Sequence, residues 1–396
     1  MSPSRPIDVP SRLRGGPVIG RRQLLGRLGI LAGAGIVGPS LLAACGSDDD
    51  TSTTGGGGGG DSKDLWFKNW PGYMDEETVD LFKEETEINL KYTEDFSDNN
   101  EEFAKFQSDL AAGRSIGPDI IAPTAWLAGR LIKLGWVQEL PLDEIPNAKN
   151  LVPDLQKPEW DPTGRFSLPY QSGMTGLAYN VSITGRELRS TEDLFDPAFK
   201  GKIGMLTEMR DTLALVMLLT GADPSNPTLD SANAAFEKIE AAKASGQIRQ
   251  FTGNDYMDDL AAGNFAACVG WSGDISQLAL DNPDLRFAIP EEGGMRWSDT
   301  MVLPNGAEHV DNAAVWMNYI YDPENAARIT EYVGYNSPVS GVREVLAAGD
   351  DYQKSLAESP LIFPDEATLA GLHIFGRLDE ETEAAFDERF AKIIGA

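Results

Sequence analysis

From residue 64 onward, short apolar runs alternate with amphipathic stretches, and this alternation constrains the fold more than any other feature of the sequence. The amphipathic stretches carry apolar residues three or four positions apart, and two of them end at glycine, as helices commonly do. Strands and helices in this order predict a largely parallel sheet with helices on both faces. The first strands are predicted at 65–70, 88–92 and 118–122, and the helices at 75–85, 100–112 and 127–134.

The second half of the chain repeats this style. Strands are predicted at 203–206, 266–270, 286–289 and 301–303, helices at 210–220 and 230–245, and helix over the remainder to residue 394. With 396 residues and no internal repeat, the chain is long for one domain and suits two α/β lobes. Ligands of open α/β sheets bind beyond the carboxyl ends of the strands, so a site is expected in those loops.

The N-terminus has the features of an export signal. Residues 1–45 hold six Arg and one Asp and end in an apolar, glycine-rich run too short for a comfortable membrane span. Arg21-Arg22 resembles a twin-arginine signal, and Leu42-Ala-Ala-Cys45 resembles a lipobox, whose cysteine receives a lipid after cleavage. We therefore expect a signal peptide over 1–45, lipidation of Cys45, and a flexible glycine-rich linker over 46–62.

Composition excludes several classes of protein. The formal net charge of −29 argues against nucleic acid as a partner, because phosphate contacts need clustered Lys and Arg, and it is compatible with a cationic ligand. Two cysteines and two histidines supply no disulfide framework, no zinc-ligand spacing and no recognisable Ser-His or Cys-His nucleophile. We expect no metal, no cofactor and no catalytic residue, and we expect Cys268 to be a buried structural thiol.

Aromatic residues and carboxylates gather in the loops that follow the predicted strands. A flexible aliphatic amine needs this mixture, because each ammonium must meet a carboxylate or an aromatic face. The methylene stem between the amines needs flat apolar walls, which Trp and Tyr supply. The residues are Trp70, Tyr73, Trp126, Glu208, Asp211, Trp271, Asp274, Trp297, Asp299 and Tyr335.

The acids in this set also have plainer interpretations. Glu208 and Asp211 stand at the start of a predicted helix and could simply complement its dipole. Asp274 could cap the next helix, and the stretch from Trp297 to Asp299 could be a turn. Their joint placement beside strand ends favours a binding site over these isolated roles.

Several motifs resemble those of the bacterial spermidine/putrescine-binding proteins, which belong to the extracellular solute-binding proteins of ABC importers. The resemblance runs over most of the chain beyond the linker. The motifs are Lys68-Asn-Trp70-x-x-Tyr73, Ala122-Pro-Thr124-Ala-Trp126, Ser167-Leu-Pro-Tyr170 through Ala178-Tyr-Asn180, Glu208-Met-Arg210-Asp211, Gly270-Trp271-Ser-Gly273, Glu291-Glu-Gly-Gly294-x-x-Trp297-x-Asp299 and Gly334-Tyr335-x-x-Pro338.

The resemblance implies a two-lobed, periplasmic-binding-protein-like (type II) α/β fold with a hinge and an interlobe ligand cleft. Lobe 1 would comprise residues 63–174 and 299–353, and lobe 2 residues 175–298 and 354–396. The acids would hold the amino groups, and the aromatic residues would enclose the carbon chain. The implied ligand-binding residues are Trp70, Tyr73, Thr124, Trp126, Glu208, Asp211, Trp271, Trp297, Asp299 and Tyr335.

The resemblance also implies a function and partners. The chain would be an exported, lipid-anchored monomer that binds a polyamine and delivers it to the permease and ATPase subunits of an importer, without catalysis. Two departures stand out: Gly72 replaces an acid common in the family, and a late family Gln has no counterpart near 372–375. The sequence therefore does not distinguish spermidine, putrescine and other amines as the ligand.

Other functions remain open on the same residues. A receptor for a sugar, an amino acid or an opine-like solute would also use Trp stacking and Asp hydrogen bonds. A glycoside hydrolase could use two carboxylates such as Glu208 and Asp299, although turnover would then be expected. A sensor or adhesin would share the site without a permease. Ferric-ion capture is disfavoured, because the paired Tyr and His of such sites are not placed in this sequence.

Overall fold

The smaller of two β-sheets is formed by the first three strands of the chain. The computed structural model describes residues 62–395. In this sheet, both neighbours of β1 run parallel to it, in the order β2-β1-β3. The strands and the helices that connect or follow them are β1 (Asp64–Lys68), α2 (Glu76–Thr86), β2 (Asn89–Thr93), α3 (Asn99–Ala111), β3 (Ile120–Ile121) and α4 (Ala125–Lys133).

Helix α2 shows why these segments fold as the sequence predicts. The side chain of Asp75 accepts a hydrogen bond from the backbone N–H of Thr78 at 2.7 Å and so caps the helix. Glu76 and Glu77 lie in the first turn, where a negative charge suits the helix dipole, and Phe82 is fully buried. The predicted helix at 75–85 is therefore confirmed to within one residue at each end.

The larger sheet has seven strands and is mixed, so the prediction of a largely parallel sheet is wrong for it. Strand β4 runs antiparallel to β7, β8 and β9, whereas β5 runs parallel to β6 and β7, and β10 runs parallel to β9. The strand order is β10-β9-β4-β7-β5-β6, with β8 also paired to β4. The strands are β4 (Leu168–Asn180), β5 (Ile203–Leu206), β6 (Ile248–Thr252), β7 (Ala267–Trp271), β8 (Leu285–Ala288), β9 (Gly294–Met301) and β10 (Leu372–His373).

Strand β9 corrects a second prediction. A strand was expected at 301–303, with Trp297 and Asp299 in a loop before it. The strand in fact ends at Met301, and both of those residues lie within it. The reason is long-range pairing: β9 aligns with β4 over most of its length, with Trp297 opposite Gly173 and Asp299 opposite Gln171.

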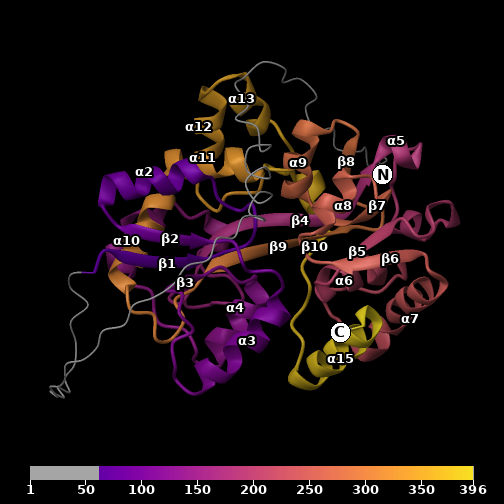
Figure 1. Cartoon of the computed structure of the whole chain (residues 1–396), viewed down its shortest axis with the longest axis horizontal. Coiled ribbons are helices and arrows are strands. Elements are labelled where there is room, and N and C mark those ends of the chain that lie inside the picture. Colours follow the sequence, from indigo (N-terminus) through magenta and orange to yellow (C-terminus); the bar gives the residue numbers. More distant parts are fainter. Residues whose placement is uncertain (1–61, 396) are drawn as a thin grey trace, which may run out of the picture. The chain divides into compact units, whose positions relative to one another are not determined.

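Helices surround both sheets, and α15 at the C-terminus lies beside α7 (Figure 1). The remaining α-helices are α5 (Val181–Thr184), α6 (Met209–Leu219), α7 (Leu229–Ser245), α8 (Tyr256–Ala261), α9 (Ser272–Asp281), α10 (Val310–Ile320), α11 (Pro323–Val333), α12 (Val342–Ala348), α13 (Asp351–Ala357), α14 (Glu366–Ala370) and α15 (Glu380–Ile394). Short 3₁₀ helices lie at Leu142–Glu144, Pro146–Asn150, Pro153–Leu155, Thr191–Phe195 and Pro197–Phe199.

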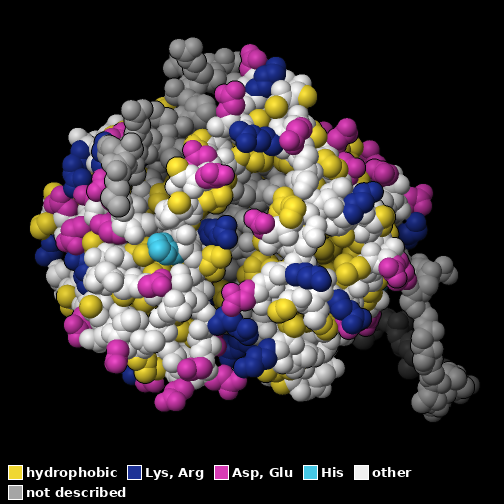
Figure 2. Space-filling view, turned by 180° about the vertical axis from the view of Figure 1, so that it is seen from behind, with side chains coloured by type: hydrophobic (Ala, Val, Ile, Leu, Met, Phe, Trp, Pro, Cys, Tyr) yellow, Lys and Arg dark blue, Asp and Glu magenta, His cyan; other side chains and the backbone are white. Residues whose placement is uncertain are grey.

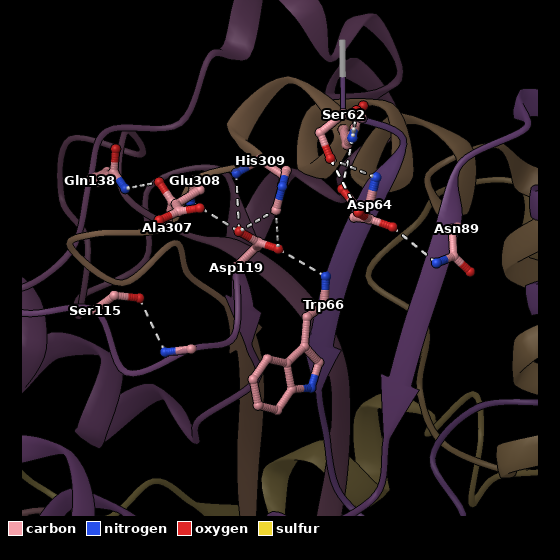
Figure 3. A network of polar contacts seen from close by, with 12 residues as sticks. Ser62, Asp64, Trp66, Asn89, Ser115, Asp119, Gln138, Ala307, Glu308 and His309 are labelled. Carbon is pink, nitrogen blue, oxygen red and sulfur yellow. Dashed lines mark hydrogen bonds and ion pairs between the residues drawn. The ribbon is translucent and has the colours of Figure 1, made fainter. Parts of the chain in front are cut away.

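Asp119 ties the small sheet to a distant part of the chain (Figure 3). It precedes β3, and its carboxylate accepts hydrogen bonds from the backbone N–H groups of Trp66 at 2.9 Å and of Glu308 and His309 at 3.0 Å. The ring nitrogen Nδ1 of His309 lies 3.0 Å from the same carboxylate. This buried acid therefore holds the segment before α10 against β1, and its role is structural.

The two sheets approach each other where β9 ends. Isolated bridges join Ile121 to Val302 and Thr124 to Asp299. By their contacts, residues 62–396 form one compact unit. The division into lobes at 174/175 and 298/299 stays a prediction.

Cys268 lies in the middle of the larger sheet. It belongs to β7, is fully buried, and pairs in register with Ala178 of β4. Burial raises the pKa of its thiol far above the ordinary value. The expectation of a buried structural thiol agrees with this position.

Three predictions lie outside the described residues: the signal peptide over 1–45, the lipidation of Cys45 and most of the linker over 46–62. Within 62–395, no helix is long and apolar enough to cross a membrane. On the face shown in Figure 2, acidic and basic side chains are interspersed and do not form one patch. The described residues on that face therefore give no charge pattern specific for a ligand.

Candidate functional site

One cavity of about 1000 Å³ collects the predicted binding residues. They come from the loop after β1, the starts of α4 and α6, the end of β7, the middle of β9 and the loop after α11. All ten line this cavity, namely Trp70, Tyr73, Thr124, Trp126, Glu208, Asp211, Trp271, Trp297, Asp299 and Tyr335.

Asp299 is held at the cavity by two hydroxyl groups. One carboxylate oxygen accepts a hydrogen bond from Thr124 Oγ1 at 2.7 Å, and the other accepts from the Tyr73 hydroxyl at 2.9 Å. The side chain is buried, and burial raises the pKa of Asp299 to about 7 despite these donors. A negative charge at this position is therefore costly unless a cation reaches it.

Glu208 is held by α3 and does not cap its own helix. It occupies the position before α6, yet its side chain makes no capping hydrogen bond. Its Oε1 instead accepts from the backbone N–H of Asn99 at 2.9 Å and from Asn99 Nδ2 at 2.8 Å, at the start of α3. Burial, with the nearby Asp98, raises the pKa of Glu208 to about 8.

Asp211 is bound to two strands of the larger sheet. Its carboxylate accepts from Thr175 Oγ1 in β4 at 2.7 Å and from Trp271 Nε1 at the end of β7 at 3.0 Å. The indole N–H of Trp297 donates to the same Thr175 hydroxyl at 3.1 Å. Two cavity indoles are thus oriented through one carboxylate, and burial raises the pKa of Asp211 as well.

These three acids share one property. Within residues 62–395, neither Glu208, Asp211 nor Asp299 forms an ion pair with a Lys, Arg or His, and every donor described above is neutral. Desolvation is the largest cause of the raised pKa for each. The charge of Arg210 lowers the pKa of Asp211 but does not cancel the rise caused by burial. A buried carboxylate without an ion-pair partner is expensive, so the cavity is electrostatically suited to a cation.

The aromatic residues form connected walls. The ring of Tyr335 lies 5.2 Å from that of Tyr73 and 5.5 Å from that of Trp297, and Trp271 lies 6.3 Å from Trp297. The Tyr335 hydroxyl donates to Asp274 Oδ1 at 2.7 Å. These rings present flat apolar surface beside the buried acids.

Two glycines allow the rings to lie against backbone. A Cβ at Gly173 would stand 2.5 Å from Trp297 and 2.9 Å from Tyr335, and a Cβ at Gly273 would overlap the Tyr335 ring. Any side chain at either position would push a ring out of place. Gly273 was part of a predicted motif, but the role of Gly173 was not foreseen.

Two of the predicted aromatic residues are less available than expected. The indole N–H of Trp70 donates to the carbonyl of Ala122 at 2.8 Å, and its ring packs 4.6 Å from Phe96. One face of Trp126 is covered by the guanidinium of Arg210, whose Cζ lies 3.5 Å from the ring centroid. Both residues line the cavity, but part of each is already used by the protein.

Sequence reasoning missed two residues that organise the acids. Asn99 connects Glu208 to Thr124, because its Nδ2 lies within hydrogen-bonding distance of both side chains. Thr175 connects Asp211 to Trp297. No local signal marks either one: an Asn at a helix start suggests a cap, and a Thr in a strand is common.

Acidic clusters can also hold metals. Among residues 62–395, no three His, Cys, Asp or Glu side chains are placed so that they could hold a metal ion.

Comparison with known proteins gives a consistent picture. The family described as bacterial extracellular solute-binding protein matches residues 77–358. The putrescine-binding periplasmic protein PotF of Escherichia coli is 28% identical over 352 residues, covering 84% of this chain and 92% of that protein. The spermidine/putrescine-binding periplasmic protein 1 of Haemophilus influenzae is 26% identical over 310 residues, covering 78% and 83%.

Solved structures share the fold. The spermidine/putrescine ABC transporter substrate-binding protein PotD of Streptococcus pneumoniae superimposes with a TM-score of 0.68 at 24% identity, covering 84% of this chain and 98% of that chain. The binding protein MotA of Agrobacterium tumefaciens, in complex with glucopine, gives a TM-score of 0.66 at 16% identity, covering 84% and 99%. The two-lobed, type II periplasmic-binding-protein architecture expected from sequence is confirmed.

Proposed function

Because the chain belongs to the bacterial extracellular solute-binding proteins, we propose that it is the receptor of an ABC importer and that its cavity binds a polyamine. In this proposal the chain binds and releases its ligand without catalysis. It works with a permease and an ATPase in the membrane, to which it delivers spermidine, putrescine or a similar amine.

One observation carries the proposal: three carboxylates without an ion-pair partner in residues 62–395, of which Glu208 and Asp299 are buried and Asp211 is half-buried, share a cavity with a connected set of aromatic rings. A polyamine supplies what each part lacks. Its ammonium groups neutralise the acids, and its methylene segments cover the rings. Charge-assisted hydrogen bonds contribute about 1.5–3 kcal/mol each, so two of them allow micromolar affinity.

The contacts suggest how a ligand lies. One ammonium is placed at Asp299, where Tyr73 and Thr124 already orient the carboxylate. A second is placed at Glu208 and Asp211, and the carbon chain between them passes over the rings of Trp271 and Trp297. Neutral donors hold the acids in position and leave their charge to the ligand.

The names of the relatives support an amine, and the fold alone does not. PotF and the Haemophilus protein are named for putrescine and spermidine, whereas MotA, of similar fold, holds glucopine. Fold likeness therefore leaves a sugar, an amino acid or an opine-like solute as the alternative. The unpaired acids of this cavity favour the amine.

Titration calorimetry tests the proposal directly. Residues 62–396, which form one compact unit, are titrated with putrescine, spermidine, a neutral disaccharide and a basic amino acid. Saturable binding of amines that weakens with salt is expected, since screening reduces charge attraction. Binding of the disaccharide or the amino acid alone would keep the receptor role and overturn the polyamine assignment.

Export and anchoring are part of the proposal and rest on the sequence of residues 1–45. The mature chain is proposed to begin at Cys45, to carry a lipid there and to stand on the outer face of the membrane as a monomer. Mass spectrometry of the membrane-bound protein is expected to find an N-terminal lipid-modified Cys45. An intact leader or an unmodified N-terminus would contradict the anchor.

A further inference from the structure

Helix α15 has an apolar face that fixes it to the part of the molecule built on the larger sheet. Phe386 and Phe390 lie on this face. The ring of Phe386 lies 5.3 Å from that of Phe236 in α7, and the ring of Phe390 lies 5.9 Å from that of Phe251 in β6. Since α7 leads into β6, and β6 is a strand of the larger sheet, α15 is docked on that side of the molecule (Figure 1).

A second face of α15 is acidic and contacts the helix that follows the small sheet. Glu380, Glu383 and Asp387 are spaced by three and four residues, which places them along one face of the helix. Lys133 Nζ lies 3.2 Å from Glu380 Oε1, and Arg130 Nη1 lies 3.8 Å from Glu383 Oε2. Both cations belong to α4, three residues apart, so they too share a face. Two helices that pack on different sheets are therefore joined by ion pairs.

Further contacts orient these groups at the cavity. Nδ2 of Asn100, in α3, lies 3.4 Å from Asp387 Oδ1 and adds a third contact to the acidic face of α15. Glu383 is held on its own side of the molecule, because Arg210 of α6 donates to its Oε1 at 2.6 Å and leaves Oε2 toward Arg130. Both cations of α4 and the three acids of α15 line the cavity. The contacts between α4 and α15 therefore lie at the opening of the cleft.

In a two-lobed binding protein the lobes move about a hinge, and contacts between them exist only while the cleft is closed. We propose that Arg130 and Lys133 of α4, with the acidic face of α15, form an electrostatic latch that favours the closed cleft even without a ligand. In this proposal α4 moves with the small sheet and α15 with the larger one. A ligand enclosed by both lobes binds the closed form, so its affinity rises with the closed fraction of the free chain. The latch concerns closure and goes beyond the identity of the ligand.

Charge reversal of one ion pair tests the latch, because the two possible effects on a cationic ligand have opposite signs. Lys133→Glu makes the cavity more negative, which by itself would strengthen the binding of an amine. If the latch exists, the same change places two acids opposite each other across the cleft, opens it and weakens binding. Glu380→Lys places two cations opposite each other and should also weaken binding. The double variant restores an ion pair in the reversed orientation and should recover the wild-type behaviour.

Two measurements on residues 62–396, which form one compact unit, follow these variants. Small-angle X-ray scattering of the ligand-free protein reports opening of the cleft through the radius of gyration. Titration calorimetry with putrescine reports affinity. The matched controls are Lys392→Glu and Glu388→Lys, which make the same changes of charge in an ion pair that lies within α15 and does not line the cavity.

Each single reversal is expected to enlarge the radius of gyration without ligand and to weaken putrescine binding about threefold or more. The double variant and both controls should stay within about twofold of the wild-type affinity, with the wild-type radius of gyration.

Tighter amine binding by Lys133→Glu would overturn the latch, and so would a radius of gyration that neither single reversal changes. If the wild-type protein binds no putrescine, the proposed polyamine function fails, and the scattering of the ligand-free variants still decides whether the latch exists. Thermal unfolding of each variant identifies one that fails to fold, and the other single reversal then decides.

Discussion

At the scale of single residues, two buried aspartates have different roles, one in the fold and one at the cavity. Asp119 accepts backbone N–H groups from two distant segments and lies outside the cavity (Figure 3). Asp299 accepts two side-chain hydroxyls and faces the cavity. The first arrangement fixes the fold. The second orients a carboxylate that has no ion-pair partner within residues 62–395 and that a cationic ligand could neutralise.

Exchanging each aspartate for asparagine should therefore separate binding from stability. Asp299→Asn removes the charge that meets an ammonium, and is expected to weaken amine binding by about 1.5–3 kcal/mol, or roughly tenfold to hundredfold. Asp119→Asn is expected to lower the free energy of unfolding by about 1–3 kcal/mol with little effect on affinity. Calorimetry and urea unfolding measure the two effects, and equal effects of both variants on binding would refute the assignment of Asp299.

At the scale of elements, local patterns predicted what local physics determines. Helix α2 and strand β5 lie within one residue of their predicted bounds, because a cap or an apolar run marks them in the sequence. Strand β9 was missed, since Trp297, Ser298 and Asp299 form a mixed polar stretch that becomes a strand only by pairing with β4. Such pairing is a long-range property that no local pattern displays.

The mixed character of the larger sheet escaped prediction for a related reason. The parallel rule applies to strands joined by a crossover helix, whereas β4 follows a run of 3₁₀ turns between 142 and 155. The prediction of the site was more successful, because all ten predicted residues line one cavity. Eight of them lie at strand ends, at helix starts or in loops, as expected for an α/β sheet, and Trp297 and Asp299 lie within β9. Asn99 and Thr175, which join the acids, could not be found without the register.

The docking of α15 gives a prediction about an element. Phe386 is fully buried against Phe236 of α7, so Phe386→Ala should cost about 3–5 kcal/mol and loosen the helix. We expect hydrogen exchange to rise over 380–394. Leu369→Ala, at a side chain 38% exposed, is the control and should change stability by less than about 0.5 kcal/mol. Unchanged exchange over 380–394 in Phe386→Ala would contradict this docking.

At the scale of the whole molecule, the buried acids link stability to pH. The carboxyl pKa values rise on folding from 3.8 to about 7 for Asp299 and from 4.5 to about 8 for Glu208. The folded chain thus binds protons more strongly than the unfolded chain. The contribution of these groups to stability is full below pH 3.8 and is lost as pH rises through about 8.

Thermal unfolding between pH 4 and pH 9 tests this linkage. Without ligand, the wild-type midpoint should fall more steeply between about pH 5 and 8 than that of an Asp299→Asn, Glu208→Gln double variant. With putrescine the loss should shrink, because the cation stabilises both carboxylates. Affinity should rise between pH 6 and 8, since the acids no longer have to release protons on binding. Parallel curves for the wild type and the double variant would show that other groups set the pH dependence.

The labelling rate of Cys268 reports how often the larger sheet opens. Its thiol sits sealed inside β7, three residues from Trp271 at the cavity, so a maleimide can reach it only while the sheet is open. Residues 62–396 contain Cys268 as their one cysteine, so mass spectrometry of this part of the chain follows its labelling alone. A ligand that binds only the closed sheet must slow this labelling by the factor 1 + [L]/Kd, and rapid, ligand-independent labelling would contradict it. The measurement needs no inserted probe, because the native thiol lies on β7, the strand that ends at Trp271 in the cavity.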